Sequence, residues 1–438
     1  MEKPFLTDQN YNPDIDITRK YLSGIVENVL IFILFVSIFF QFFPYYRGIF
    51  RISYYFSTIF FIFYFSLQAL KLEGFNFCKP ILFVYFIFIC WMFYGLLSLF
   101  FSTNHEDGVW YMHLRFMSFF NFYVMTQFLV NQKRIRAYGF IVILCIIFNF
   151  GVCIWEITTF QHLPTSRYYE IPIYIPTGAF PNENDLPSAV LICVPILFFM
   201  KEKRWKYLCT VLMLLFLIIT GFQGSRFCLF AFLPFFLYHY IFKTNKLYKI
   251  ITIISVVLLV TIIIYKLPSV VFFAKKQIRE HILSLKFEAE SQRITSGRVR
   301  YELFIVNIEK MIDTYGFGVG IGNYEKSDNP ERLHEAQQTV YAHNYFMEIL
   351  ANEGIIGFTL LCIIVLYVIL PILKNKPSIL ALLNKNNYSE TEKRVALFFI
   401  FYLVATNVPA TICGYFIFWS MLGYNFALAY NCQAEKMI

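Results

Sequence analysis

The stretch AYGFIVILCIIFNFGVCIWEITT, residues 137–159, decides the fold class of this chain. Its only charged side chain is Glu156, and the basic segment 133–136 directly precedes it. A helix of this length rises about 35 Å, which is enough to cross the hydrocarbon core of a bilayer. The stretch is therefore predicted to be a transmembrane helix with its basic flank outside the hydrocarbon.

Similar apolar runs recur along the chain. Of the 438 residues, 58 % are hydrophobic and 15 % are charged, whereas soluble domains average about 25 % charged residues. The sequence thus predicts an all-α, polytopic membrane bundle of about twelve transmembrane helices. The predicted spans are 25–43, 52–70, 81–102, 109–130, 137–159, 187–200, 205–222, 226–242, 247–265, 355–373, 395–412 and 414–433. The span 187–200 is short, and 109–130 contains His113 and Arg115.

The distribution of positive charge predicts the topology. With the N-terminus inside, the inner segments hold 21 Lys and Arg and the short outer stretches hold four. Because Lys and Arg are retained on the cytoplasmic side, both termini are expected there. The net charge of +9 is then a topology signal, and nucleic-acid binding is not expected. Residues 1–24 are polar, so no cleavable signal peptide is expected.

These assignments divide the chain into five parts. A cytoplasmic tail (1–24) precedes transmembrane helices one to nine (25–265), and a large extracytoplasmic loop (266–342) precedes the tenth. An interfacial helix and the last three spans follow (343–433), and then a short cytoplasmic tail (434–438). The large loop has 11 basic and 10 acidic residues, so it is nearly neutral and is expected to fold.

The segment HNYFMEILANEGIIG, residues 343–357, carries the most specific pattern. A helix is expected to run from about 343 to 352, break near Glu353–Gly354 and resume as a span. His343 and Asn344 would then lie at an outer helix N-terminus, where free amides favour anions and keep imidazole neutral. A neutral histidine can act as a general base. The alternative is a histidine that caps an interfacial helix.

Three arginines are candidates for phosphate contacts. Arg226 follows a two-helix turn on the outer side, and its planar group suits diphosphate oxygens. Arg298 and Arg300 open a predicted helix over 298–313, with Ser296 as a plausible cap. The alternatives are an arginine that snorkels to the interface for Arg226 and a solvated helix face for the other two.

The segment AFPNENDL, residues 179–186, places polar groups just before an apolar span. The amides of Asn182 and Asn184 suit sugar hydroxyls. The alternative is helix capping by Asn184 or Asp185, with Pro187 in the first turn.

The sequence lacks the motifs of several other classes of protein. There is no Walker loop, no C-x-x-C and no H-x-x-x-H pair, so ATP-driven transport, a disulfide framework and a zinc site are not expected. The loop 44–50 lacks the paired carboxylates with which many lipid-dependent glycosyltransferases hold a metal. Neither a metal nor another cofactor is therefore expected.

Taken together, these motifs resemble those of the O-antigen ligase and O-antigen polymerase superfamily of bacterial envelope proteins, which includes teichuronic-acid and exopolysaccharide polymerases. The resemblance rests on PNENDL (181–186), Ser225–Arg226, SGR (296–298), G-x-G-x-G-N (318–323) and the ligase-type pattern H-N-x9-G-x-x-G from His343. One departure is Phe227, where the family often has glycine after the serine–arginine pair.

The resemblance implies an enzyme of the bacterial cytoplasmic membrane that works at its outer face. It would transfer glycan from a polyprenyl diphosphate to an acceptor hydroxyl on a glycan, a lipid or a protein. His343, Arg226 and Arg298 would be catalytic; Arg300, Asn182, Asn184, Asn344 and Glu353 would bind substrate. Polymerase is slightly preferred over ligase. The alternatives are a secondary transporter or flippase and an inactive partner of other envelope-assembly proteins.

Overall fold

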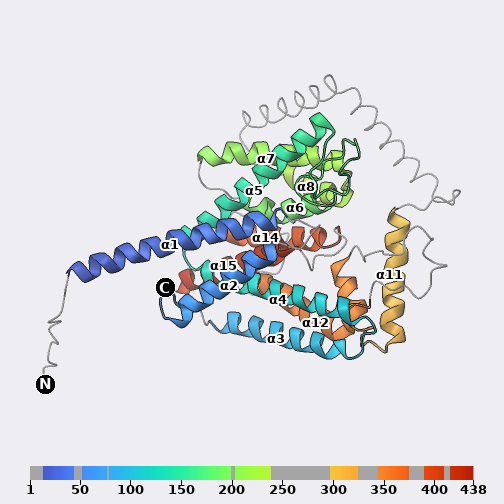
Figure 1. Ribbon diagram of the computed structural model, residues 1–438, viewed down its shortest axis with the longest axis horizontal. Helices are drawn as coiled ribbons and strands as arrows, with labels where there is room; N and C mark the ends of the chain where they lie inside the picture. Colours follow the sequence, from blue (N-terminus) through green and yellow to red (C-terminus); the bar gives the residue numbers. More distant parts are fainter. Residues whose placement is uncertain are drawn as a thin grey trace.

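The computed structural model describes residues 13–43, 52–75, 78–198, 203–237, 296–323, 344–373, 389–408 and 415–437. Within these ranges every regular element is a helix (Figure 1). The helices are α1 (Pro13–Gln41), α2 (Ile52–Ala69), α3 (Lys79–Leu99), α4 (His105–Phe128), α5 (Gln132–Thr159), α6 (Asp185–Phe198), α7 (Lys203–Gln223), α8 (Arg226–Leu237), α11 (Ser296–Asp313), α12 (Tyr345–Leu373), α14 (Glu390–Ala405) and α15 (Phe416–Met437).

The structure confirms the predicted all-α membrane bundle. In the described part of the chain, five helices are long and apolar enough to cross a membrane, namely Gly24–Gln41, Lys79–Leu99, Gln132–Thr159, Trp205–Gln223 and Tyr345–Leu370. Helices α2, α6 and α8 contain shorter apolar stretches. The predicted span 247–265 and the loop segments 266–295 and 324–342 lie outside the described residues.

The two spans that fitted the apolar pattern least well, in α4 and α6, lie inside the bundle. Helix α4 packs against α2, α3 and α15, and α6 packs against α5, α7 and α14. Arg115, Asn121 and Gln127 of α4 are buried, so these polar groups face protein rather than lipid. Residues Asp185–Leu197 of α6 are all buried. A helix enclosed by others can be short or polar because its neighbours cover it.

The segments that the charge pattern assigns to the outer side meet at one end of the bundle. There α11 packs against α12 and runs beside the ends of α3 and α4 (Figure 1). Hydrogen bonds join these segments. They connect Ser102 with Asn323, Gln223 with Pro176, Tyr345 with Thr406, and Asp185 with Tyr415. These contacts fit a chain whose successive loops lie at alternate ends of the bundle. We call the end where α11 lies the α11 end.

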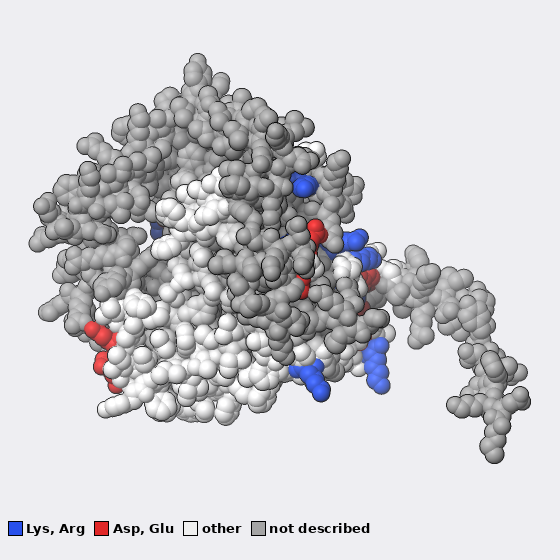
Figure 2. Space-filling view, turned by 180° about the vertical axis from the view of Figure 1, so that it is seen from behind, with Lys and Arg blue, Asp and Glu red and all other residues white. Residues whose placement is uncertain are grey.

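The opposite end, where α1 begins and α15 ends (Figure 1), is held by Arg134. Its guanidinium donates to Glu27 at 3.1 Å and to Glu73 at 2.8 Å. It thereby ties α5 to α1 and to the loop after α2. Figure 2 shows Asp and Glu gathered at the lower left and most of the visible Lys and Arg, with some Asp and Glu, at the right; the white surface between them is formed by other residues. Which compartment each end faces stays a prediction from the charge pattern.

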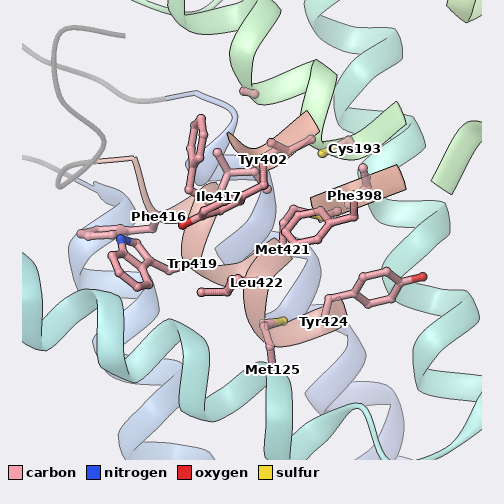
Figure 3. Close-up of a cluster of buried hydrophobic side chains, with 14 of the residues drawn as sticks. Met125, Cys193, Phe398, Tyr402, Phe416, Ile417, Trp419, Met421, Leu422 and Tyr424 are labelled. Carbon is pink, nitrogen blue, oxygen red and sulfur yellow. The ribbon is translucent and has the colours of Figure 1, made fainter. Parts of the chain in front are cut away.

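Helix α15 occupies the centre of the apolar core. Figure 3 shows its side chains beside Phe398 and Tyr402 of α14, Cys193 of α6 and Met125 of α4. Close to this core, Gln41 of α1 donates to Asn121 of α4 at 2.7 Å and accepts from Ser420 of α15 at 2.8 Å. Such buried polar links between helices fix their relative register, because slipping would leave the amides unpaired.

Candidate functional site

Helix α12 breaks where the sequence predicts it. Gly354 has φ 63° and ψ −160° and divides a half-helix, Tyr345–Glu353, from the membrane-spanning part that follows. This backbone conformation is open essentially to glycine alone. A Cβ at Gly354 would also lie 2.5 Å from the carbonyl carbon of Phe317. Glycine is therefore needed at position 354 for two reasons: the backbone conformation there, and the close packing of another segment against it.

That segment is the glycine loop, residues 314–323, which follows α11. Its Val319 and Gly320 amides donate to the carbonyls of Ala351 and Asn352, each at 2.9 Å, and the Ile355 amide donates to the Gly316 carbonyl at 2.9 Å. A broken helix leaves such groups without intrahelical partners. The glycine loop thus satisfies the backbone groups that the break in α12 exposes.

Asn323, the last residue of the G-x-G-x-G-N motif, fastens the glycine loop to the turn between α3 and α4. Its side-chain oxygen accepts from the Thr103 and Asn104 amides at 3.1 and 3.0 Å, and from the Ser102 hydroxyl at 3.1 Å. Its amide nitrogen donates to the Val319 carbonyl at 2.6 Å. One side chain therefore joins α3, α4 and the glycine loop at the α11 end.

Glu353, the last residue of the half-helix, is fully buried and paired with Arg115 of α4. Arg115 also donates to the other carboxylate oxygen at 3.0 Å, and the Trp91 indole donates to that same oxygen at 2.9 Å. The contacts of its carboxylate in the described structure are thus all internal to the protein. The predicted substrate-binding role of Glu353 stays a prediction.

The start of the half-helix is capped by Asn344, whose side-chain oxygen accepts from the Met347 amide at 3.2 Å. The Tyr345 amide donates to the Thr406 carbonyl at the end of α14, also at 3.2 Å. These contacts place the half-helix N-terminus at the α11 end. His343, the residue before Asn344, lies outside the described residues.

The start of α6 lies in the same region of the fold. The Asn182 side chain accepts from the Asn184 amide at 3.1 Å, and the Asn184 carbonyl accepts from the Ser188 hydroxyl at 2.8 Å. Both asparagines are half-buried. Asp185 is buried, and one of its carboxylate oxygens accepts from the Tyr415 hydroxyl. Asn182 thus helps to begin the helix, a task that the sequence had suggested for Asn184 or Asp185.

The turn between α7 and α8 packs beside the start of α6. The Ser188 Oγ and Cys228 Sγ atoms lie 3.8 Å apart, and the Gln223 side chain donates to the Pro176 carbonyl at 2.9 Å. Arg226 is the first residue of α8, and only its backbone is described. The structure therefore brings together the backbones of the two motifs that contain Asn182 and Arg226.

Helix α11 forms as predicted from the SGR motif. It begins at Ser296, so Arg298 and Arg300 lie in its first two turns, and it packs against α12. The side chains of these two arginines are not described. The sequence pattern of the same loop also favours a helix over 274–293, which lies outside the described residues.

Sequence reasoning missed how the loop 160–184 is held. Buried Glu156 accepts from the Thr177 and Gly178 amides at 2.9 and 2.7 Å and contacts His162 Nδ1 at 2.8 Å. His162 Nε2 contacts the Ile173 carbonyl at 2.7 Å. Both ring nitrogens thus face acceptors, which suits the doubly protonated ring. Burial lowers the pKa of His162, but the bonds to Glu156 and Ile173 outweigh it, so the net shift is upward.

Arg167 is a further charged group that the sequence did not single out. It donates to the Glu183 carboxylate at 2.5 Å, while about half of its side chain stays exposed. Its backbone amide donates to the Pro181 carbonyl at 2.9 Å.

Among the described residues, no group of three or more His, Cys, Asp or Glu side chains is placed to hold a metal ion.

Two comparisons bear on this arrangement. The O-antigen ligase family model matches residues 208–362, a range that includes Arg226, Arg298, the glycine loop, His343 and Gly354. The chain is also 23 % identical over 351 residues to the teichuronic acid biosynthesis protein TuaE of Bacillus subtilis (strain 168), covering 76 % of this chain and 68 % of that protein. Both comparisons support the resemblance to the O-antigen ligase and polymerase superfamily that the sequence motifs indicated.

Proposed function

We propose that this protein transfers glycan from a polyprenyl diphosphate to an acceptor hydroxyl at the outer face of the bacterial cytoplasmic membrane. The family match supports the coarser statement, a ligase- or polymerase-type role in surface polysaccharide synthesis. One observation carries the proposal furthest. Segments far apart in sequence, at the starts of α6, α8 and the half-helix of α12, gather at one end of the bundle.

The proposed reaction follows from the residues in these segments. The acceptor oxygen forms a bond to the anomeric carbon as the bond from that carbon to the diphosphate breaks, with inversion. His343 takes the hydroxyl proton. Arg226 and Arg298 stabilise the negative charge on the leaving diphosphate. Since α8 begins at Arg226, the positive end of its helix dipole would favour an anion there.

The acceptor side of the site is proposed at Asn182, Asn184 and Asn344. The two half-buried amides near α6 match the hydroxyl donors and acceptors of a sugar. The acceptor would be a second lipid-linked glycan in a polymerase, and another lipid or a protein in a ligase. We favour the polymerase slightly, because such enzymes also occur in envelopes without lipid A.

A transporter or flippase is the alternative. It would place polar groups and broken helices near the middle of the membrane. Here the break at Gly354 and the glycine loop lie at the α11 end instead, which favours chemistry at the membrane surface.

The experiment supplies purified protein in liposomes with a polyprenyl-diphosphate glycan and measures extended or transferred product, with and without EDTA. We expect transfer in both conditions, and a strict need for a divalent ion would refute the metal-independent mechanism. His343→Ala should insert normally and lose about 10²–10⁴ in rate. Arg226→Lys keeps the charge but loses the planar fork, so a partial defect is expected. Wild-type turnover in His343→Ala would remove the proposed base.

A further inference from the structure

The buried pair of Arg115 and Glu353 calls for an explanation beyond stability. Both side chains are at most 4 % exposed, and they join α4 to the break in α12. Taking two charges out of water is costly, and apolar residues of similar volume often serve stability at least as well. Charged groups inside membrane helices are rare and usually have a functional reason.

Two glycines, one in α3 and one in α12 itself, leave room for this pair. A Cβ at Gly95 of α3 would lie 2.7 Å from the Met112 sulfur and 3.2 Å from the Arg115 guanidinium carbon. A Cβ at Gly357 would lie 2.7 Å from a Glu353 carboxylate oxygen. Gly357 is the last glycine of the H-N-x9-G-x-x-G pattern. Its lack of a side chain is thus explained by the carboxylate beside it.

The pair also sits at the fixed end of the half-helix. Glu353 ends the half-helix and Asn344 caps its start, so the two are about 14 Å apart along the helix. An aromatic path runs alongside: the Trp91 and Trp419 ring centroids are 5.9 Å apart, and those of Trp419 and Tyr345 are 6.2 Å apart. Because the half-helix is about 14 Å long, a small tilt at Glu353 would displace its start by a larger distance.

We propose that Arg115 and Glu353 form a positioning pair that sets the tilt of the half-helix, and thereby the placement of Asn344, a proposed acceptor-binding residue, at the α11 end. This inference rests on the proposed function of that site. Glu353 acts through the half-helix and not on substrate. The pair fixes one end of the half-helix, while the Thr406 carbonyl holds the other.

The chain offers a matched control in the pair of Arg134 and Glu27, at the opposite end of the bundle. Arg134 is 5 % exposed and Glu27 is 15 % exposed, so this is also an arginine–carboxylate contact shielded from water, in which Arg134 has Glu73 as a second partner. Glu353→Gln and Glu27→Gln each remove one negative charge while keeping the side-chain shape. Both should lower the thermal stability, but only Glu353→Gln should disturb the half-helix.

The first measurement is the kinetics of transfer in liposomes. We expect Glu353→Gln to lower kcat at least tenfold with KM for the lipid-linked donor unchanged, and Glu27→Gln to leave kcat within twofold of wild type. The double variant Arg115→Met/Glu353→Met removes both charges and should regain thermal stability without regaining kcat. If kcat instead follows thermal stability across all variants, the pair is merely structural and the proposal is wrong.

The second measurement does not depend on activity. Hydrogen–deuterium exchange of the peptide covering 344–353 should speed up at least tenfold in Glu353→Gln and stay unchanged in Glu27→Gln. Equal exchange in both variants would overturn the positioning role. If the wild-type protein transfers no glycan, the proposed function fails, while the exchange data still decide whether the pair holds the half-helix.

Discussion

Replacing Gly354 by alanine tests the reasoning about the broken helix most directly. In the native conformation, with φ 63° and ψ −160°, any residue with a side chain carries a backbone cost of about 1–3 kcal/mol. The new Cβ would in addition lie 2.5 Å from the Phe317 carbonyl carbon. Because the glycine loop occupies that space, either the backbone or the glycine loop must move.

The size of the effect follows from what each movement breaks. Displacing the glycine loop removes the backbone bonds from Ile355 to Gly316, from Val319 to Ala351 and from Gly320 to Asn352. Each is worth about 0.5–1.5 kcal/mol. If the glycine loop stays in place, the strained backbone at position 354 and the close contact of the new Cβ with Phe317 remain instead. By either route we expect the free energy of unfolding to fall by about 2–4 kcal/mol.

The assay is thermal unfolding in detergent, followed by the loss of monodisperse protein. Gly151→Ala is the control, because Gly151 lies in α5 and a Cβ there would meet nothing within 4 Å. We expect Gly354→Ala to unfold several degrees below wild type and Gly151→Ala to unfold close to it. Equal unfolding temperatures for the two variants would refute the account of the break.

Two further predictions concern the α11 end. His162 has a raised pKa in the folded protein, so its contribution to stability is complete below about pH 6.5 and is lost as the pH rises through the folded pKa. The unfolding temperature should therefore fall on the alkaline side, and His162→Gln should flatten that slope; an unchanged slope would contradict the proton assignment. Asn323→Ala removes the oxygen that accepts from the Thr103 amide and the Ser102 hydroxyl, and leaves the Asn104 amide with Ser102 alone. We expect a loss of about 2–4 kcal/mol in unfolding free energy. Wild-type stability in thermal unfolding would show that Asn323 does not fasten the glycine loop.

The sequence alone determined the fold class and much of the local structure. Uncharged runs long enough to cross a bilayer predicted helices close to where the structure has them, because a chain in lipid must satisfy its backbone within each helix. The break at Gly354 and the start of α11 near Ser296 were also predicted. Glycine and helix-start residues act within a few residues of themselves, so their effect can be read locally.

Only the tertiary structure decided which side chains meet. Arg115 and Glu353 are 238 positions apart, and Ser102 and Asn323 are 221 apart, so no local pattern links them. In the sequence, Arg115 was only an exception in an apolar span and Glu353 a predicted substrate-binding residue; nothing there indicated that the two form a buried ion pair. Desolvation requires a buried charge to find a partner, but the packing of the helices selects which partner it finds.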